Sequence, residues 1–500
     1  MSDTMRYTKL LTALALLPFL CSCCNKSSSV KGSEEPVSPP EKPQESSAVA
    51  YVTTADKTRL FEESALPIRK AGSMAVNKVE LDSTVRYQTI DGFGAALTGS
   101  SCYNLMQMEP SARNTFLKEI FDKKDGLGVS LIRVSIGSSD FGLDEYTWCD
   151  VKGIGNFAVN TYDKRDVFPV LKEIYSINPD VKIIGTPWTA PRWMKRGVNV
   201  NVDYYSWTSG RLKPSCYQDY AQYFVKWIQT MEKEGFDIYA VTLQNEPLNK
   251  GNSMSMFMTW EEQRDFIKEA VGPAFAKAGL DTKILLFDHN YNYDNLADQQ
   301  EYPLKILADP EAAKYVAGTA WHNYSGNVAE LDKIASKAPG KDIFFTEASI
   351  GGWNYDFAKT LINDFDNIFM QTLSRGNKGV TLWNLMLDQN SGPKRPGGCQ
   401  NCYGVVTLDT NTGKVSERNT HYYQIAHASK VISQGAVRIS ATGVNAAGIS
   451  YLAFLNPDHS YGIIALNTGA EDFQFTFSDK TNSVKLAVPA KSIASVRWKL

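Results

Sequence analysis

Residues 238–247 read IYAVTLQNEP, an apolar run that ends in polar side chains. The apolar residues at its start fit a buried β-strand, because aliphatic and aromatic residues favour that environment. The run then ends in Gln244, Asn245 and Glu246, and Pro247 follows, which lacks the N–H that a continuing central strand needs. An amide and a carboxylate at the end of a core strand indicate a site, provided that several strand ends meet there.

Eight apolar runs of this kind follow one another from about residue 89, and amphipathic stretches separate most of them. In residues 216–235 the apolar side chains recur at spacings of three and four, as in a helix. Strands alternating with helices predict an α/β protein, a closed (β/α)8 TIM barrel over residues 89–427. A doubly wound open sheet is the alternative, but DGFGAA lacks the spacing of a phosphate-binding fingerprint. The runs are TIDGFGAALT, VSLIRVSIG, VKIIGTPW, IYAVTLQNEP, KILLFDHN, VAGTAWHNY, DIFFTEAS and GVTLWNLM.

Residues 428–500 have a different pattern. Short alternating or β-branched runs such as GISYLAFLN and YGIIALN are separated by Gly, Asn, Asp and Pro. This pattern predicts a small antiparallel β-sandwich. We expect residues 51–88, which precede the barrel, to add a strand to it, and this would bring the two parts of the chain together.

The first residues have the pattern of an export signal. Arg6 and Lys9 precede an apolar run that is too short to span a bilayer but has the length of a signal-peptide core. The run ends in LCSC, which resembles a bacterial lipobox with Cys23 as the acylated residue; an ordinary secretory signal is the alternative. We expect a lipoprotein signal peptide over 1–22, a flexible linker over 23–50, and an exported, lipid-anchored protein at the outer membrane, with no other membrane contact.

Composition limits the kind of partner. The chain has 500 residues and is 43% hydrophobic, enough for a large core and a smaller second domain. Lys and Arg number 52 against 54 Asp and Glu, and no basic cluster is evident. Nucleic acid is therefore not an expected partner, and a neutral ligand is.

The cysteines predict a loop disulfide rather than a metal site. Three of the eight lie in the signal region, and an exported chain meets an oxidising compartment. Cys399 and Cys402 could close a small loop, and the odd count leaves at least one free thiol. Zinc would need a second ligand pair, and the five histidines are widely scattered, so no metal or cofactor is expected.

Two carboxylates occupy equivalent places in the pattern. Glu246 ends the fourth apolar run and Glu347 ends the seventh. In a TIM barrel the carboxyl ends of the strands form the active site, so these side chains could converge. Two carboxylates about 5–5.5 Å apart are the arrangement of a retaining glycosidase, with one nucleophile and one acid/base.

Seven motifs in order resemble glycoside hydrolase family 30 from about residue 67 to the C-terminus: TIDGFGAALT, LIRVSIGSSDF, TPWTAPRWMK, TLQNEP, WHNY, FFTEAS and LWNLML. The resemblance implies that Glu246 is the acid/base and Glu347 the nucleophile. Because an acid must carry its proton, we expect burial and the charge of Glu347 to raise the pKa of Glu246.

The resemblance also implies supporting residues. Arg133 is expected beside the nucleophile, His322 and Tyr324 are expected to orient it and line the subsite, and Asp140 is expected against sugar hydroxyls. A satisfied core histidine and a loop-capping aspartate are the structural alternatives for His322 and Asp140. On chemical grounds, Asn245 would hydrogen-bond the sugar 2-hydroxyl.

Tryptophans offer a further signal. Trp188, Trp193, Trp353 and Trp383 could all be core residues. Trp188 and Trp383, however, fall at strand ends, where an aromatic face can stack on a sugar ring.

The substrate expectation depends on the resemblance alone. FGLDEYTWCD and GGCQNCYGVVTLD are similar to the family branch that acts on linear β-1,6-glucan. We therefore expect internal cleavage of that polymer with retention. A β-glucosidase or glucosylceramidase-like enzyme and a β-xylan hydrolase are alternatives within the family. A noncatalytic glycan-binding lipoprotein is the alternative outside it, but it would have no reason to keep two carboxylates.

Overall fold

The computed structural model describes residues 47–72 and 76–499. The predicted signal peptide, the lipidation residue Cys23 and most of the predicted linker lie outside the described residues. Strand β1 (Ser47–Thr54) begins before residue 50, so the predicted linker is too long at its C-terminal end. Among the described helices, none has the length and apolar character needed to cross a bilayer.

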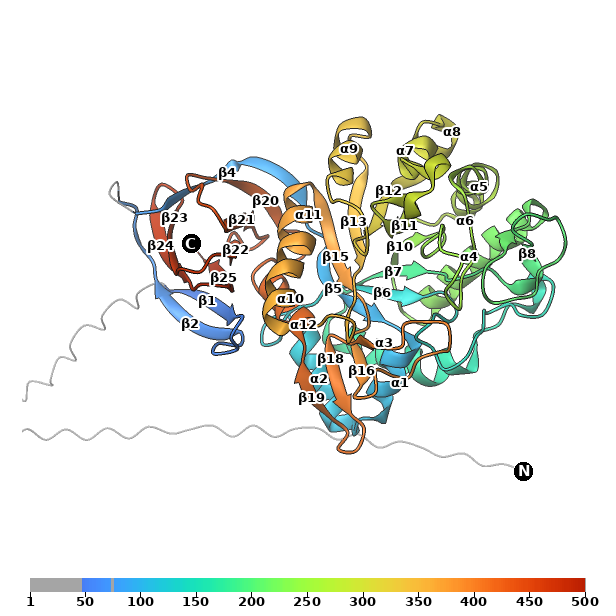
Figure 1. Cartoon of the computed structure of the whole chain (residues 1–500), viewed down its shortest axis with the longest axis horizontal. Helices are drawn as coiled ribbons and strands as arrows, with labels where there is room; N and C mark the ends of the chain where they lie inside the picture. Colours follow the sequence, from blue (N-terminus) through green and yellow to red (C-terminus); the bar gives the residue numbers. More distant parts are fainter. Residues whose placement is uncertain (1–46, 73–75, 500) are drawn as a thin grey trace, which may run out of the picture. The chain divides into compact units, whose positions relative to one another are not determined.

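Eight parallel strands close into a barrel, which confirms the predicted TIM barrel and excludes the open sheet (Figure 1). Each of the eight predicted runs supplies one strand, and β15 pairs with β5 to complete the ring. Glu246 follows the fourth strand and Glu347 ends the seventh, as predicted. In order, the strands are β5 (Gly92–Leu97), β6 (Leu131–Ser135), β7 (Lys182–Thr186), β10 (Ile238–Thr242), β11 (Lys283–Asn290), β12 (Val316–His322), β13 (Asp342–Glu347) and β15 (Asn377–Leu382).

Helices cover the outside of the barrel, and π-helical turns join several of them end to end. The helices are α1 (Gly99–Gln107), α2 (Pro110–Phe121), α3 (Phe168–Ile177), α4 (Tyr217–Lys233), α5 (Trp260–Phe266), α6 (Gly272–Ala278), α7 (Tyr302–Leu307), α8 (Pro310–Ala313), α9 (Glu330–Lys337), α10 (Phe357–Asp364), α11 (Gln371–Ser374) and α12 (Thr420–Ser429).

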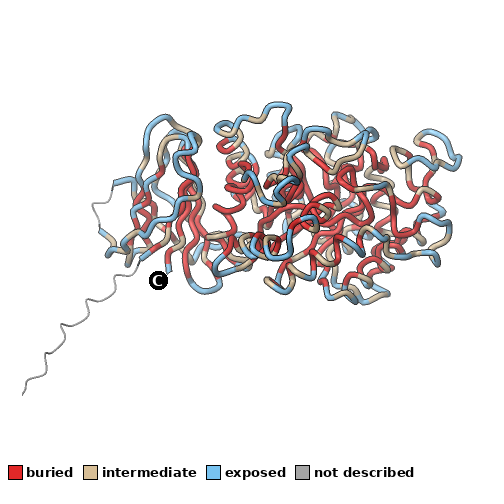
Figure 2. Tube along the Cα trace, turned by 90° about the horizontal axis from the view of Figure 1, so that it is seen from below, coloured by how far each residue is buried: buried red, intermediate tan, exposed pale blue. Residues whose placement is uncertain are grey.

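The barrel is packed on both sides of its strands, and Figure 2 shows buried segments running through the barrel and the sandwich alike. Close helix contact requires a small residue in β7: a Cβ on Gly185 would lie 2.7 Å from the indole of Trp227 in α4. The interior is filled by one buried side chain from each of six strands: Leu131, Ile184, Ala240, Leu285, Ala320 and Phe344. This filled interior leaves the polar strand ends as the place for a site.

The remaining strands form mainly one ten-stranded sheet, which confirms the β-sandwich domain. The strand order is β2-β1-β25-β22-β21-β20-β4-β23-β24-β3, so segments from before and after the barrel interleave as predicted. Pairing is antiparallel except between β4 and β23, which run parallel, so the predicted all-antiparallel sheet is wrong at this pair. These strands are β2 (Glu62–Pro67), β3 (Arg69–Lys70), β4 (Lys78–Thr89), β20 (Val437–Thr442), β21 (Ile449–Leu455), β22 (Tyr461–Asn467), β23 (Phe473–Ser478), β24 (Asn482–Val488) and β25 (Ser492–Trp498).

A buried histidine ties the last barrel helix to the sandwich. His427 of α12 places Nδ1 2.9 Å from Ser495 Oγ and Nε2 2.8 Å from Thr53 Oγ1. Burial lowers the pKa of His427 to about 3, so the imidazole is neutral and its two hydrogen bonds are structural.

Candidate active site

The turn after strand β10 gives the polar residues of that run their direction. The N–H of Asn245 donates to the carbonyl of Pro187 at 2.8 Å, and that of Glu246 donates to the carbonyl of Asp288 at 3.0 Å. Glu246 has a φ of 44°, in the left-handed region that non-glycine residues rarely occupy. Such strain is typical of functional sites, where neighbouring contacts hold it in place.

The two predicted carboxylates converge. Glu347 ends β13 and lies beside His322 of β12 in the sheet register. A carboxylate oxygen of Glu246, one of Glu347 and a ring nitrogen of His322 all lie within 4.8 Å of one another. Both carboxylates are buried.

Arg133 of β6 lies beside Glu347, as predicted. Its Nη1 donates to Glu347 Oε2 at 2.5 Å, and its Nη2 donates to Asn245 Oδ1 at 2.6 Å and to Asp288 Oδ2 at 2.9 Å. The planar guanidinium suits this role because its donors have a fixed geometry. Since Asn245 accepts through its oxygen, its amide NH2 group remains available as a donor to a sugar hydroxyl.

Asp288 is a central residue to which the sequence interpretation gave no role. It is fully buried in β11, and its φ of 64° coincides with a register irregularity between Phe287 and His289. Its carboxylate accepts from Thr242 Oγ1 at 2.7 Å and from Thr346 Oγ1 at 2.6 Å, in addition to the bond from Arg133. The polar residues at the end of KILLFDHN can be read from the sequence, but the register irregularity that turns Asp288 inward cannot.

His322 bridges two carboxylates. Its Nδ1 lies 3.3 Å from Glu246 Oε1, and its Nε2 lies 3.0 Å from Asp288 Oδ1. Burial opposes the charged ring, but the charge of Glu347 and the hydrogen bonds to Asp288 and Glu246 together raise the pKa of His322 to about 9. The ring is therefore an imidazolium at neutral pH.

This imidazolium corrects the expected pKa of Glu246. Burial favours the neutral acid, but the hydrogen bond from His322 and the charges of His289 and His322 lower the pKa to about 2. Asn249 adds a bond from Nδ2 to Glu246 Oε2 at 2.8 Å. The sequence expectation of a raised pKa was wrong because it considered burial and Glu347 but not the histidines.

Glu347 has the opposite shift. Burial raises its pKa, while His322 and Arg133 oppose the rise by favouring the carboxylate. The hydroxyl of Tyr324 donates to Glu347 Oε1 at 3.0 Å and also lies 3.0 Å from Ser349 Oγ. These contacts fix the orientation of the Glu347 carboxylate.

Asp140, in the loop after β6, lies close to both carboxylates. It is buried, and burial together with the charges of Glu347 and Glu246 raises its pKa to about 7. Gly398 packs directly against it, since a Cβ there would lie 2.6 Å from the Cβ of Asp140. Asp140 is thus a buried acid beside Glu246 and Glu347, not a capping residue at the surface.

Trp188 and Trp383, the two tryptophans predicted at strand ends, are mostly buried against each other. They are 2% and 4% exposed, and they stack on each other with centroids 5.2 Å apart. The guanidinium carbon of Arg133 lies 4.9 Å from the Trp188 ring centroid and 5.6 Å from that of Trp383. Trp353 is instead 48% exposed, so it is no core residue.

Most of the predicted site residues line one cavity of about 330 Å³. This volume lies within the range of about 300–1,000 Å³ that is usual for small-ligand sites. Arg133 and His322 do not line it and act through the residues that do. Its predicted members are Asp140, Trp188, Asn245, Glu246, Tyr324, Glu347 and Trp383; the sequence interpretation missed Asn249, Asn252, Asn290, Ser349 and Trp353.

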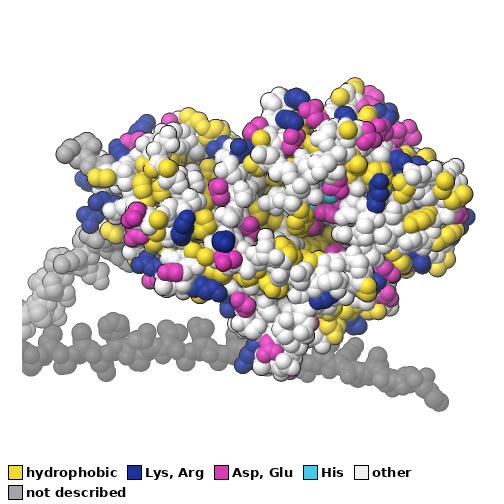
Figure 3. Space-filling model, in the orientation of Figure 1, with side chains coloured by type: hydrophobic (Ala, Val, Ile, Leu, Met, Phe, Trp, Pro, Cys, Tyr) yellow, Lys and Arg dark blue, Asp and Glu magenta, His cyan; other side chains and the backbone are white. Residues whose placement is uncertain are grey.

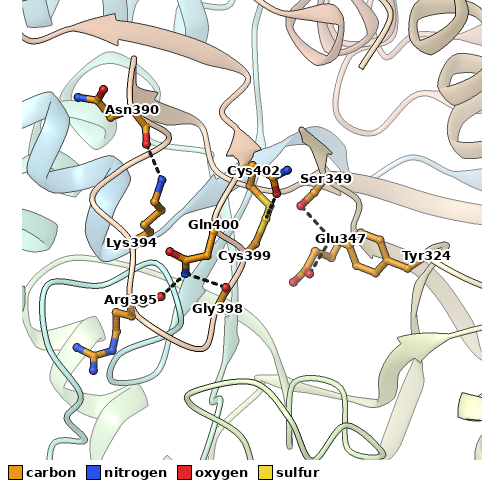
Figure 4. The surroundings of a disulfide bond; sticks show 11 residues. Tyr324, Glu347, Ser349, Asn390, Lys394, Arg395, Gly398, Cys399, Gln400 and Cys402 are labelled. Carbon is orange, nitrogen blue, oxygen red and sulfur yellow. Dashed lines mark hydrogen bonds between the residues drawn. A yellow bond between two sulfur atoms is a disulfide. The ribbon is translucent and has the colours of Figure 1, made fainter. Parts of the chain in front are cut away.

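The predicted disulfide forms one wall of this cavity. Cys399 and Cys402 are bonded and line it, while Cys102, Cys149 and Cys216 are free and buried. Figure 4 shows the disulfide facing Glu347, Ser349 and Tyr324. Strand β17 (Cys402–Tyr403) pairs with β14 (Ile350–Gly351), which directly follows the Glu347 segment. The loop therefore supports the segment that follows Glu347.

Glu246, His322 and Glu347 also have the donor types of a metal site. Arg133, however, already pairs with Glu347, and His322 carries a proton at neutral pH. The charges of Arg133 and protonated His322 already compensate the carboxylates. The same charges would repel a metal ion. The expectation of no metal stays a prediction.

Two buried carboxylates that meet at the carboxyl edge of a TIM barrel, beside an arginine and an asparagine, define a glycoside hydrolase. Residues 90–432 match the family model of the glycosyl hydrolase family 30 TIM-barrel domain, and residues 435–496 match that of the family 30 β-sandwich domain. The chain belongs to glycoside hydrolase family 30.

Similar proteins share most of the chain. An endo-1,6-β-D-glucanase of Neurospora crassa is 32% identical over 87% of this chain and 91% of its own length. The lysosomal acid glucosylceramidase of Mus musculus is 28% identical over 83% of this chain and 82% of its own. The solved structure of the endo-β1,6-glucanase BT3312 is 49% identical, with a TM-score of 0.88 over 91% of this chain and all of that one.

Proposed function

We propose that this enzyme cleaves β-1,6-glucosidic bonds inside linear β-1,6-glucan by double displacement with retention. The convergence of Glu246 and Glu347 in one cavity is the observation that carries the mechanism. The 49% identity to an endo-β1,6-glucanase over nearly the whole chain supports the substrate. In Figure 3 acidic and basic side chains are interspersed over the visible face, which suits a neutral polymer.

In the first step, Glu347 attacks the anomeric carbon while Glu246 protonates the departing oxygen. In the second, Glu246 takes a proton from water, which displaces Glu347 from the sugar. The separation supports this sequence, because a carboxylate oxygen of Glu246 lies within 4.8 Å of one of Glu347. That is nearer to the spacing of about 5–5.5 Å between the carboxyl groups of retaining enzymes than to the about 6.5–9.5 Å of inverting ones.

The proton that Glu246 donates is shared with His322. Before substrate binds, the proton lies on the imidazole of His322, which contacts Glu246 and Asp288 through its two ring nitrogens. When a glycosidic oxygen approaches Glu246, negative charge begins to develop on that oxygen and draws the proton to it through the carboxyl group. Asp288 and Glu347 favour return of a proton to His322 after each cycle.

The charges of the site also suit the transition state. The carboxylates of Glu246, Asp288 and Glu347 oppose Arg133 and protonated His322, so these five groups carry one uncompensated negative charge. An oxocarbenium-like sugar carries positive charge, and a buried site stabilises it more strongly than water does.

A glucosylceramide-type β-glucoside is the second candidate, supported by the 28% identity to the lysosomal enzyme. Product analysis on β-1,6-glucan, β-1,3-glucan, β-xylan, glucosylceramide and an aryl β-glucoside separates the two. Short β-1,6-linked oligosaccharides from the first polymer alone support the proposal. Cleavage of glucosylceramide or xylan with β-1,6-glucan left intact contradicts it.

Export and lipid anchoring at the outer membrane are also proposed, from the residues around Cys23. Metabolic labelling with a fatty acid should mark the protein when it is expressed with its predicted signal peptide. A Cys23→Ala variant should lose the label. Label retained by that variant would contradict acylation at this residue.

A further inference from the structure

A second cavity adjoins the catalytic one beside the loop that follows β13. Its volume of about 400 Å³ also lies in the range of about 300–1,000 Å³ for ligand sites. The two cavities share Tyr324, Ser349 and Trp353 in their walls. A chain that leaves the catalytic cavity across these three residues therefore enters the second one.

The shared wall presents aromatic surface to solvent. Tyr324 is 44% exposed and Trp353 is 48% exposed. The Trp353 ring folds back over Gly351, where a Cβ would lie 2.0 Å from a ring carbon, so any larger residue would displace it. Exposed rings that border a cavity provide apolar faces on which a sugar ring can lie.

One polar helix face forms another part of the second cavity. Helix α10 continues through a π-helical turn (Phe365–Met370) into α11, as Figure 1 shows. Lys359 and Asn363 line the cavity from α10, and Asn367 lines it from the π-helical turn that follows.

The chemistry of the lining suits an uncharged polyhydroxyl ligand. Lys359 and Asp364 have opposite charges, so the cavity has no net charge to select an anion or a cation. Within residues 47–72 and 76–499, the side-chain amides of Asn363 and Asn367 have no hydrogen-bond partner in the protein. Each amide can both donate to and accept from sugar hydroxyls.

We propose that the second cavity is a distal glycan subsite, which holds a glucosyl unit of the polymer beyond those at the catalytic carboxylates. This proposal rests on the function proposed above and extends the binding site from one cavity to two. It requires that affinity rise with the length of the glycan, as suits an enzyme that cuts within a chain.

The test is the double variant Asn363→Ala/Asn367→Ala. Both residues are exposed on a helix, and alanine favours helix, so folding is preserved. We compare kcat/KM for β-1,6-linked gluco-oligosaccharides of increasing length with kcat/KM for an aryl β-glucoside. In the double variant, kcat/KM for the longest oligosaccharide divided by kcat/KM for the aryl β-glucoside should fall about tenfold, because two hydrogen bonds are lost. An unchanged ratio overturns the proposal.

The matched control is Gln222→Ala/Gln229→Ala, which removes two exposed amides from α4. Its ratio should equal that of the wild type, and an equal fall in both variants would overturn the proposal. Trp353→Ala should lower the ratio as well. Tyr87→Ala, an aromatic residue with the same 48% exposure in the sandwich, should not.

Failure of the proposed function would be distinguishable from failure of the subsite. If the wild type cleaves another glycan instead, kcat/KM is measured for oligosaccharides of that glycan and compared with kcat/KM for the aryl β-glucoside. A tenfold fall of this ratio in Asn363→Ala/Asn367→Ala would still support the subsite. Calorimetric titration of Glu347→Ala with the same oligosaccharides needs no turnover. The affinity of Glu347→Ala should rise with the length of the oligosaccharide. In the triple variant, which adds Asn363→Ala/Asn367→Ala, this rise should be abolished. If the affinity of Glu347→Ala does not depend on length, the proposal is overturned.

Discussion

The Nδ1 atom of His322 lies 3.3 Å from a carboxylate oxygen of Glu246, so the proposed acid/base and an imidazolium form one buried pair. Glu246 alone would be ionised at neutral pH, because its pKa is lowered to about 2. The pair, however, keeps one proton until His322 loses it near pH 9. Such coupled groups titrate together, and their pH dependence belongs to the pair.

The pair predicts an alkaline limit to activity. His322 is protonated below its raised pKa of about 9, so kcat/KM on β-1,6-oligosaccharides should fall as the pH rises through about 9. An activated aryl glucoside needs less protonation, so its decline should be shallower. A pH profile for the oligosaccharides that falls instead near pH 6.5, the usual value of histidine, would contradict the pairing.

The same shift predicts a change in stability with pH. Because the pKa of His322 is higher in the folded protein than the unfolded value of about 6.5, its contribution is fully present below pH 6.5. It is lost as the pH rises through about 9. The melting temperature of His322→Gln should therefore depend less on pH between about 6.5 and 9 than that of the wild type.

Asp288 should act as a positioning residue. Burial favours its neutral form, but Arg133 and His322 hold its pKa well below the usual range. Asp288→Asn keeps the size and removes the charge, so it should lower kcat and also move the alkaline limit to lower pH. Thr346→Val, which removes a neutral hydrogen bond to the same carboxylate, should lower the melting temperature but leave that limit in place. An unmoved limit in Asp288→Asn would show a purely structural role.

Removal of the acid should be costly in a way that depends on the leaving group. Glu246→Ala should lower the rate on β-1,6-oligosaccharides by about 10²–10⁴-fold. Single-turnover rates on an activated aryl glucoside should fall much less, because that leaving group departs without full protonation. Equal losses on both substrates would assign Glu246 to binding or structure.

The disulfide should influence substrate binding more than folding. A four-residue loop loses little entropy on closure, so Cys399→Ser/Cys402→Ser should lower the free energy of unfolding by only about 2 kcal/mol. The wall behind Ser349 would loosen, and KM for long oligosaccharides should rise severalfold. A reductant should have the same effect on the wild type and none on the double variant. Equal sensitivity of both proteins to the reductant would contradict the assignment.

The sequence predicts those features that can be read from each strand separately. Alternation of apolar runs and helices predicted the barrel, and the positions of Glu246 and Glu347 at strand ends predicted their convergence. Arg133 beside Glu347 came from the family resemblance. The convergence of the two carboxylates follows from the parallel direction of barrel strands, which brings all carboxyl ends to one edge.

Features that depend on the angle of a side chain or on several loops could not be predicted. A register irregularity turns Asp288 inward, and the period of an ideal strand does not contain it. Trp188 and Trp383 stand at strand ends, but only their mutual distance shows that they stack on each other. The low pKa of Glu246 required the position of His322, which lies on a different strand.

The anomeric configuration of the first product tests the central claim most directly. Proton NMR during rapid hydrolysis of β-1,6-oligosaccharides follows the newly formed reducing end before it equilibrates. Attack by Glu347 followed by water inverts the anomeric carbon twice, so the β-anomer should appear first and the α-anomer only later. Initial release of the α-anomer would contradict the double displacement by Glu246 and Glu347.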